Sequence, residues 1–137
     1  MANLIPKSVK KEQTDAWKAE TWKVCLLKNT YTPDAAHIVY ADVSAHEITG
    51  TNYTAGGATI TPANKTSAYS TNDAMLDAVD IAWTTATFTN AARYAVCYET
   101  SGSKIRAIFD LGADYTVTVG TFTLVWSASG LIKVLTA

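Results

Sequence analysis

Residues 22–60 read WKVCLLKNTYTPDAAHIVYADVSAHEITGTNYTAGGATI, and this stretch decides the fold class. Its first six residues alternate with a period of two, which predicts a β-strand over 22–27. Residues 29–34 and 50–57 hold the proline, asparagine and paired glycines that are typical of turns. Short strands are expected over 38–40, 45–49 and 58–60.

The rest of the chain continues the pattern of short strands. Residues 91–100 show the clearest alternation, and Ser101-Gly102-Ser103 predicts a tight turn into a second strand over 104–110, so these form a hairpin. Residues 75–87 are compatible with a helix, but we favour a strand over 78–84. Residues 63–72 are a loop or an edge strand. Further strands are expected over 117–118, 121–127 and 131–136, with turns at 111–114 and 129–130.

Some eight to ten short strands with at most one short helix predict an all-β fold, an antiparallel β-sandwich or a barrel of jelly-roll-like kind. The composition agrees, because the chain of 137 residues holds 21 threonines, whose branched Cβ suits a pleated surface. We expect an N-terminal arm over 1–20 and one all-β domain over 21–137.

The arm differs from the rest in charge. Residues 1–28 hold six lysines against three acidic residues, whereas the remainder holds five basic residues against nine acidic ones. A basic segment on an acidic body can dock onto an acidic partner. The alternatives are that the lysines are solvated and that the tryptophans cover the core of the chain itself. The candidate partner-binding residues are Lys7, Lys10, Lys11, Trp17 and Trp22.

Several functional classes are disfavoured. Two arginines and no interleaving of basic with aromatic residues argue against nucleic-acid binding. No apolar run approaches the roughly 20 residues of a membrane helix. The N-terminus lacks a signal-peptide core, so we expect folding in a cytoplasm. There Cys25 and Cys97 are expected as buried thiols, or as a bridge if their strands face each other.

No constellation predicts catalysis, a cofactor or a metal. His37 and His46 lack metal-ligand spacing, although Asp34, Asp42 and Glu47 are near them in sequence. A hydrolase built from a cysteine and one of these histidines is a distant alternative. Three acidic residues lie close together and suggest, at most, a calcium contact; these are Asp73, Asp77 and Asp80.

A set of strand and turn motifs resembles a family of small virion structural proteins of tailed bacteriophages. The resemblance spans about residues 20–135, and its motifs are Tyr31-Thr-Pro-Asp34, Tyr40-Ala-Asp-Val43, Glu47-Ile-Thr-Gly50, the turn over 52–57, Ala92-Arg-Tyr-Ala-Val-Cys-Tyr98, Phe122-Thr-Leu-Val-Trp126 and Gly130-Leu-Ile132. It implies a non-enzymatic protein on the particle, a capsid decoration (cement) protein or an accessory head or tail protein.

As a decoration protein the chain is expected to bind the major capsid protein on the outer capsid surface, after folding in the host cytoplasm. A homotrimer would match the three-fold sites of such a capsid. The alternative is a tail- or fibre-associated module that binds host-surface glycan. It would use aromatic residues in loops around Tyr31, Tyr53 and Tyr69.

Overall fold

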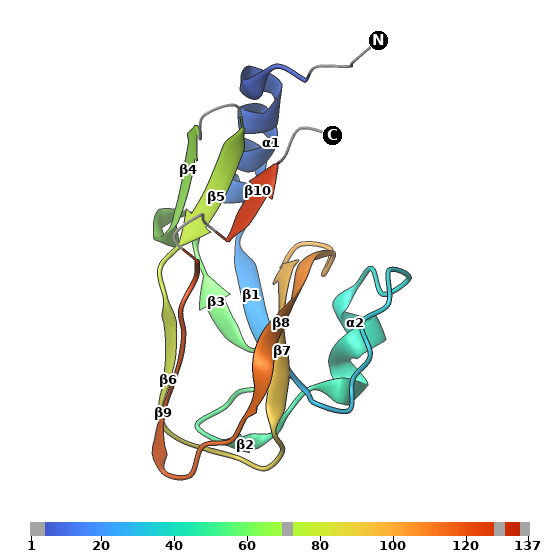
Figure 1. Ribbon diagram of the computed structural model, residues 1–137, viewed down its shortest axis with the longest axis vertical. Helices are drawn as coiled ribbons and strands as arrows, with labels where there is room; N and C mark the ends of the chain where they lie inside the picture. The colour runs from blue at the N-terminus through green and yellow to red at the C-terminus, as the bar shows by residue number, and fades with distance from the viewer. Residues whose placement is uncertain (1–4, 70–72, 128–130, 135–137) are drawn as a thin grey trace. The chain divides into compact units, whose positions relative to one another are not determined.

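The computed structural model describes residues 5–69, 73–127 and 131–134, and it consists mainly of antiparallel β-sheet (Figure 1). The predicted all-β, sandwich-like fold with one N-terminal helix is confirmed. The helices are α1 (Lys7–Ala19) and the single turn α2 (Tyr40–Val43), and two 3₁₀ turns cover Ser44–His46 and Pro62–Asn64. The strands are β1 (Trp22–Lys28), β2 (Gly50–Thr51), β3 (Ala58–Ile60), β4 (Lys65–Tyr69), β5 (Ala74–Ala78), β6 (Ile81–Phe88), β7 (Ala92–Glu99), β8 (Ile105–Tyr115), β9 (Gly120–Leu124) and β10 (Ile132–Val134).

The chain divides into two compact units. The first comprises Met1–Thr21, Ile60–Asp80 and Val125–Ala137, and the second comprises Trp22–Thr59 and Ile81–Leu124. A boundary between an arm and a β domain at residue 20 therefore does not describe how the chain is organised. The helix belongs with strands that follow it by more than 40 residues, and sequence periodicity carries no information on such long-range packing.

In the first unit, helix α1 packs against a three-stranded sheet of order β10-β5-β4 (Figure 1). The face that it buries is polar. Nζ of Lys10 pairs with Oδ1 of Asp73 at 2.7 Å, and the hydroxyls of Thr14 and Ser67 lie 2.6 Å apart. Nζ of Lys65 donates to the carbonyls of Trp17 and Glu20 at the helix C-terminus. The Trp17 carbonyl also accepts from N of Glu20 at 3.3 Å, so this lysine adds a charged donor at the helix C-terminus, where carbonyls have few partners within the helix.

In the second unit, a four-stranded sheet of order β3-β1-β7-β8 and a three-stranded sheet of order β2-β6-β9 provide the core. β1 pairs antiparallel with β7, with Cys25 opposite Val96. Side chains that oppose each other share a face, and on one face Cys25, Val96 and Tyr98 pack with Val43.

The second sheet of this unit buries aromatic residues. Trp83 of β6 lies opposite Phe122 of β9, with ring centroids 6.0 Å apart. Tyr53 joins the two sheets, because its ring lies 5.9 Å from Trp83 and its hydroxyl accepts a hydrogen bond from N of Leu26. Layers of antiparallel sheet with a shared aromatic core are what the strand-and-turn pattern predicted.

Five predicted segments differ from the structure. The strand expected over 38–40 is reduced to a single bridge of Val39 with Lys104, because the Asp42 carboxylate accepts hydrogen bonds from N of Ile38 and N of Val39 and so caps the turn α2. The strand expected over 45–49 is reduced to a bridge of Glu47 with Leu27, since the 3₁₀ turn occupies its first residues. The turn expected over 111–114 lies within β8, which continues to Tyr115. No strand covers residues 117–118, because β9 begins only at Gly120. The single strand expected over 78–84 is instead the end of β5 and the beginning of β6. The turn expected at 129–130 lies outside the described residues.

Candidate functional site

The candidate partner-binding lysines of α1 lie in three different environments. Lys7 is exposed, and its Nζ lies 4.9 Å from the ring centroid of Tyr69. Lys11 is half-buried and pairs with Asp15 at 2.7 Å. Lys10 is only 1 % exposed and is held by Asp73. Two of the three lysines can therefore reach a partner, and Lys10 is part of the core of the first unit.

The two candidate tryptophans do not form a common surface. Trp22 begins β1 and is fully buried within the second unit. Trp17 lies on α1 in the first unit, where it is half-buried and its carbonyl accepts from Lys65. Trp22 therefore packs in the core of the chain itself, which was the alternative to a partner-binding role.

The outward surface of α1 carries two exposed apolar side chains beside polar ones, whereas the largest apolar residue of the helix, Trp17, is half-buried. Ile5 and Val9 are 41 % and 49 % exposed, and they border a hollow of about 450 Å³. Val9 and Ala16 are seven residues apart and so lie on one face of the helix. The buried Lys10 also borders this hollow; we call its more exposed lining the α1 outer face and define it by Ile5, Val9, Glu12, Gln13 and Ala16.

The polarity of α1 is thus the reverse of that of an ordinary surface helix. A helix on a folded domain normally buries its apolar stripe and exposes its polar side. Here Lys10 and Thr14 are buried, whereas Val9 is half exposed. The spacing of Ile5, Val9 and Ala16 is visible in the sequence, but only the packed structure shows that this stripe faces outward.

A buried polar network around Glu47 holds the loop between α2 and β3. Oε2 of Glu47 accepts from the Tyr40 hydroxyl at 2.5 Å, and Oε1 accepts from the Tyr53 hydroxyl at 2.7 Å and from N of Gly56 at 2.9 Å. Burial, together with the hydrogen bond to Glu47, raises the pKa of the Tyr40 hydroxyl. Both carboxylate oxygens are engaged by donors of the chain itself, and the Tyr53 hydroxyl in turn accepts from N of Leu26 on β1, so the network fastens residues 47–56 to β1.

The two histidines and the carboxylates of Asp34 and Asp42 contact groups that are near them in the sequence. His37 Nδ1 is hydrogen-bonded to the Tyr31 hydroxyl at 2.8 Å, and the His46 ring centroid lies 5.2 Å from that of Tyr31. Asp34 accepts from N of Ala36 and Asp42 caps α2. Among the described residues, no three histidine, cysteine, aspartate or glutamate side chains converge as a metal site would require.

The two cysteines lie on adjacent strands but point to opposite faces. Cys25 opposes Val96, and Cys97 opposes Val24, so the two sulfur atoms are separated by the sheet. Both are free and buried, and burial raises the pKa of the Cys25 thiol. A bridge between them is excluded by this register, and burial disfavours the thiolate that a nucleophile needs.

The aromatic residues that a glycan site would use are mostly covered. Tyr31 and Tyr53 are buried within the second unit, and only Tyr69 is exposed. The Tyr69 ring lies beneath the Lys7 ammonium group. Stacking of a sugar at Tyr69 would have to displace this cation.

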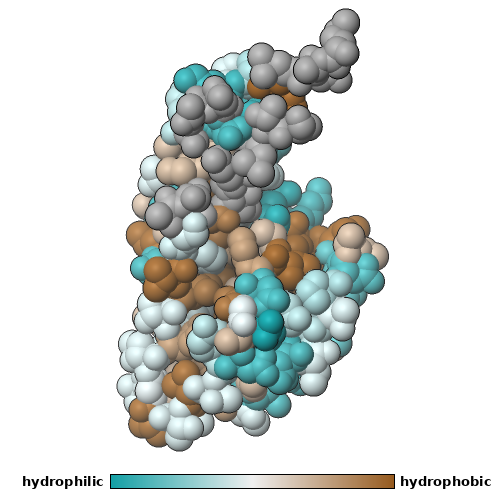
Figure 2. Space-filling model, viewed as in Figure 1, coloured by the Kyte–Doolittle hydropathy of each residue, from teal (hydrophilic) through white to brown (hydrophobic). Residues whose placement is uncertain are grey.

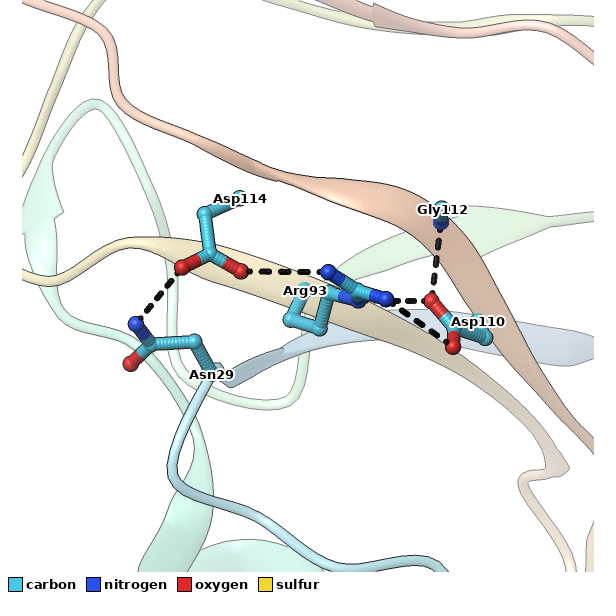
Figure 3. A network of polar contacts seen from close by, with 5 residues as sticks. All are labelled: Asn29, Arg93, Asp110, Gly112 and Asp114. Atoms are coloured by element: carbon cyan, nitrogen blue, oxygen red, sulfur yellow. Dashed lines mark hydrogen bonds and ion pairs between the residues drawn. The ribbon is translucent and has the colours of Figure 1, made fainter.

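A surface network fixes the outer strand of the four-stranded sheet (Figure 3). Nε of Arg93 on β7 donates to Oδ1 of Asp110 on β8 at 2.7 Å, and Nη1 of Arg93 lies 3.5 Å from Asp114. Asn29 donates to Asp114, and N of Gly112 donates to Asp110. The Arg93 side chain lowers the pKa of the Asp110 carboxyl. The single positive charge of Arg93 thus bridges two carboxylates, and these contacts hold together the irregular part of β8 around Gly112.

Comparisons with protein-family models, with curated proteins and with solved structures found no match to this chain. Within the described residues, no helix is both long and apolar enough to cross a membrane.

Proposed function

We propose that this chain is a non-enzymatic structural protein of a tailed-phage virion, and most specifically a capsid decoration protein that binds the major capsid protein through the α1 outer face. The observation that carries the proposal is the reversed polarity of α1, which directs Ile5 and Val9 outward. The resemblance of residues 20–135 to small virion proteins of tailed bacteriophages supports the choice of a phage particle as the partner. A three-fold site of such a particle would accommodate a trimer.

The energy available at this surface suits one contact of a larger interface. Complete burial of a valine contributes about 1.5–3 kcal/mol, so covering the exposed half of Val9 would contribute about 1 kcal/mol. Ile5 is exposed to a similar degree. Linking three copies in a trimer on one three-fold site would multiply such a modest contribution by avidity.

Charge supports a role for α1 in approaching an acidic surface. Lys7 is exposed on the first turn of the helix, whereas Lys11, one turn later, is half-buried and already paired with Asp15. Exposed lysines steer encounters with an acidic partner, and this effect weakens as salt is added. Attachment is therefore expected to slow at high ionic strength.

The alternative function, a tail- or fibre-associated module that binds host glycan, has less support. Of its three candidate tyrosines, two are buried, and the third, Tyr69, is exposed but has the Lys7 ammonium group over its ring. A glycan array that returned a specific ligand would favour this alternative over decoration.

The proposal is tested by binding of the purified chain to particles that lack it. Val9→Glu places a carboxylate in the α1 outer face, and burial of an unpaired carboxylate costs several kcal/mol. Since about 1.4 kcal/mol corresponds to a factor of ten, the affinity should fall at least tenfold. Val79→Glu is the matched control, because Val79 is an exposed valine of the same unit but lies outside α1. Equal binding by both variants and the unmodified chain would refute the role of α1.

A further inference from the structure

The sheets of the described residues have six edge strands, and five of them carry a feature that hinders pairing with another chain. Natural edges are blunted by shortness, by charge, by inward-pointing lysines or by bulges. β2 has two residues, and β3 and β10 have three each. β4 points Lys65 inward, where this lysine is 2 % exposed. β8 carries Arg106, Asp110 and Asp114 and is bulged near Gly112.

β9 is the exception among the described strands. It is five residues long and reads GTFTL, without charge or proline. It pairs with β6 alone, with Phe122 opposite Trp83 and Thr123 opposite Ala82. The irregularity of this pair lies in β6, between Trp83 and Ala86, so the end of β9 from Phe122 onward is regular. Its outer edge presents backbone groups to an incoming strand.

The whole sheet that ends in β9 lacks charge. Three segments of the sequence hold no lysine, arginine, aspartate or glutamate: 48–64, 81–92 and 115–132. β2, β6 and β9 all fall within them. Figure 2 shows white and brown residues over β6 and β9, with the hydrophilic residues of that unit gathered beside them. The exposed side chains of β6 and β9 include Ala82, Thr84, Thr121 and Thr123.

Exposed valines flank this strand. Val119 precedes β9 and is 73 % exposed, and Val125 follows it and is 67 % exposed. Val119 has a φ of 45°, which is unfavourable for a β-branched residue. The backbone N of Val119 donates a hydrogen bond to Oγ1 of Thr87 at 3.0 Å, which holds the residue in this conformation. A strained residue is retained only where its surroundings hold it in place, and this one lies next to the uncharged edge.

We infer that β9 is an interaction surface for a second copy of this chain, and that two β9 strands pair antiparallel about a two-fold axis at Phe122. A two-fold interface brings identical patches together, so any charge near its axis meets the same charge on the partner. The charge-free sheet avoids that repulsion. In this pairing Thr121 lies opposite Thr123 of the partner copy, and threonine pairs across strands are favourable.

The same register brings the Val119 end of one strand beside the Val125 end of the other. Val119, the most exposed large apolar side chain of the described residues, would then lie at the rim of the paired strands. A two-fold axis generates a dimer, so this inference competes with the trimer that capsid symmetry would favour. It concerns self-association and stands or fails independently of the α1 outer face.

The test is sedimentation of the full chain over a wide range of concentration, because five paired residues predict a dimer that dissociates on dilution. The unmodified chain should approach twice its mass of 14.7 kDa. The double variant Thr121→Lys, Thr123→Lys places like charges opposite each other and should weaken the dimer about tenfold or more. Thr66→Lys is the matched control, since Thr66 is an exposed threonine on edge strand β4.

Rescue distinguishes pairing from damage to the fold. A mixture of the double lysine variant with Thr121→Glu, Thr123→Glu should restore a mixed dimer, because opposite charges then face each other. Amide hydrogen exchange should show protection of β9 that rises with protein concentration. A monomer at every concentration, a trimer, a dimer unaffected by the β9 substitutions, or no rescue would each overturn the inference.

Discussion

Removal of the Glu47 carboxylate should cost the second unit several kcal/mol of stability. In Glu47→Ala the Tyr40 hydroxyl, the Tyr53 hydroxyl and N of Gly56 lose their acceptor. Tyr53 and Gly56 are buried, so water does not readily replace the carboxylate for these two donors. Tyr40 is only partly buried and can turn to solvent.

The magnitude follows from the number of donors left unsatisfied. Each buried donor without an acceptor costs about 1–3 kcal/mol. Two such donors, with a smaller loss at Tyr40, predict a decrease of about 3–5 kcal/mol in the free energy of unfolding. A small domain has about 5–15 kcal/mol in total, so the variant should be severely destabilised.

The assay is urea unfolding followed by tryptophan fluorescence. Tyr53→Phe removes one hydroxyl while keeping the ring and should cost about 1–2 kcal/mol. Glu12→Ala is the matched control, because Glu12 is an exposed glutamate on α1 and should change stability by less than about 0.5 kcal/mol. A loss below about 1 kcal/mol in Glu47→Ala would refute the view that this network fastens the loop.

Two further predictions concern the hairpin tip and the glycines. Glu99 has its pKa lowered to about 2, chiefly by the Ser101 hydroxyl and then by backbone N–H donors of the turn. The folded carboxyl is more acidic than the unfolded one, so its stabilisation is full above the unfolded value and is lost as the pH falls toward 2. Unfolding measured from pH 6 to pH 2 should show this loss, and Glu99→Gln should remove it; an identical pH profile for both would contradict the assignment. Gly57→Ala should destabilise the chain by more than about 2 kcal/mol, because Gly57 has a φ of 87° and a Cβ there would lie 1.9 Å from the Val24 carbonyl oxygen. Gly112→Ala, with a φ of 84° and open space around the Cβ, should cost only about 1 kcal/mol in thermal or urea unfolding; equal losses at the two sites would show that the close approach at Gly57 is unimportant.

Strands with strict alternation were predictable from sequence. The strand over 22–27 corresponds to β1, and the hairpin of 91–100 with 104–110 corresponds to β7 and β8. Each of these elements has a local cause, either a period of two or a glycine turn. The edge-strand alternative for 63–72 is confirmed by β4 in its described part, residues 65–69.

The remaining elements depend on long-range or side-chain contacts that a linear pattern does not contain. Asp42 converts an apolar run near Val39 into a capped turn. Lys10 is buried because Asp73 lies 63 residues away in sequence and beside it in space. For the same reason the α1 outer face was missed, since nothing local distinguishes a buried lysine from a solvated one.

Copy number in the particle tests the central claim most directly. Mass spectrometry or calibrated gel densitometry of purified virions from the source of this chain would measure its ratio to the major capsid protein. The account predicts hundreds of copies per particle, in near-stoichiometric proportion to the capsid lattice. A few to a few dozen copies, or absence from the particle, would contradict the proposal that this chain decorates the capsid.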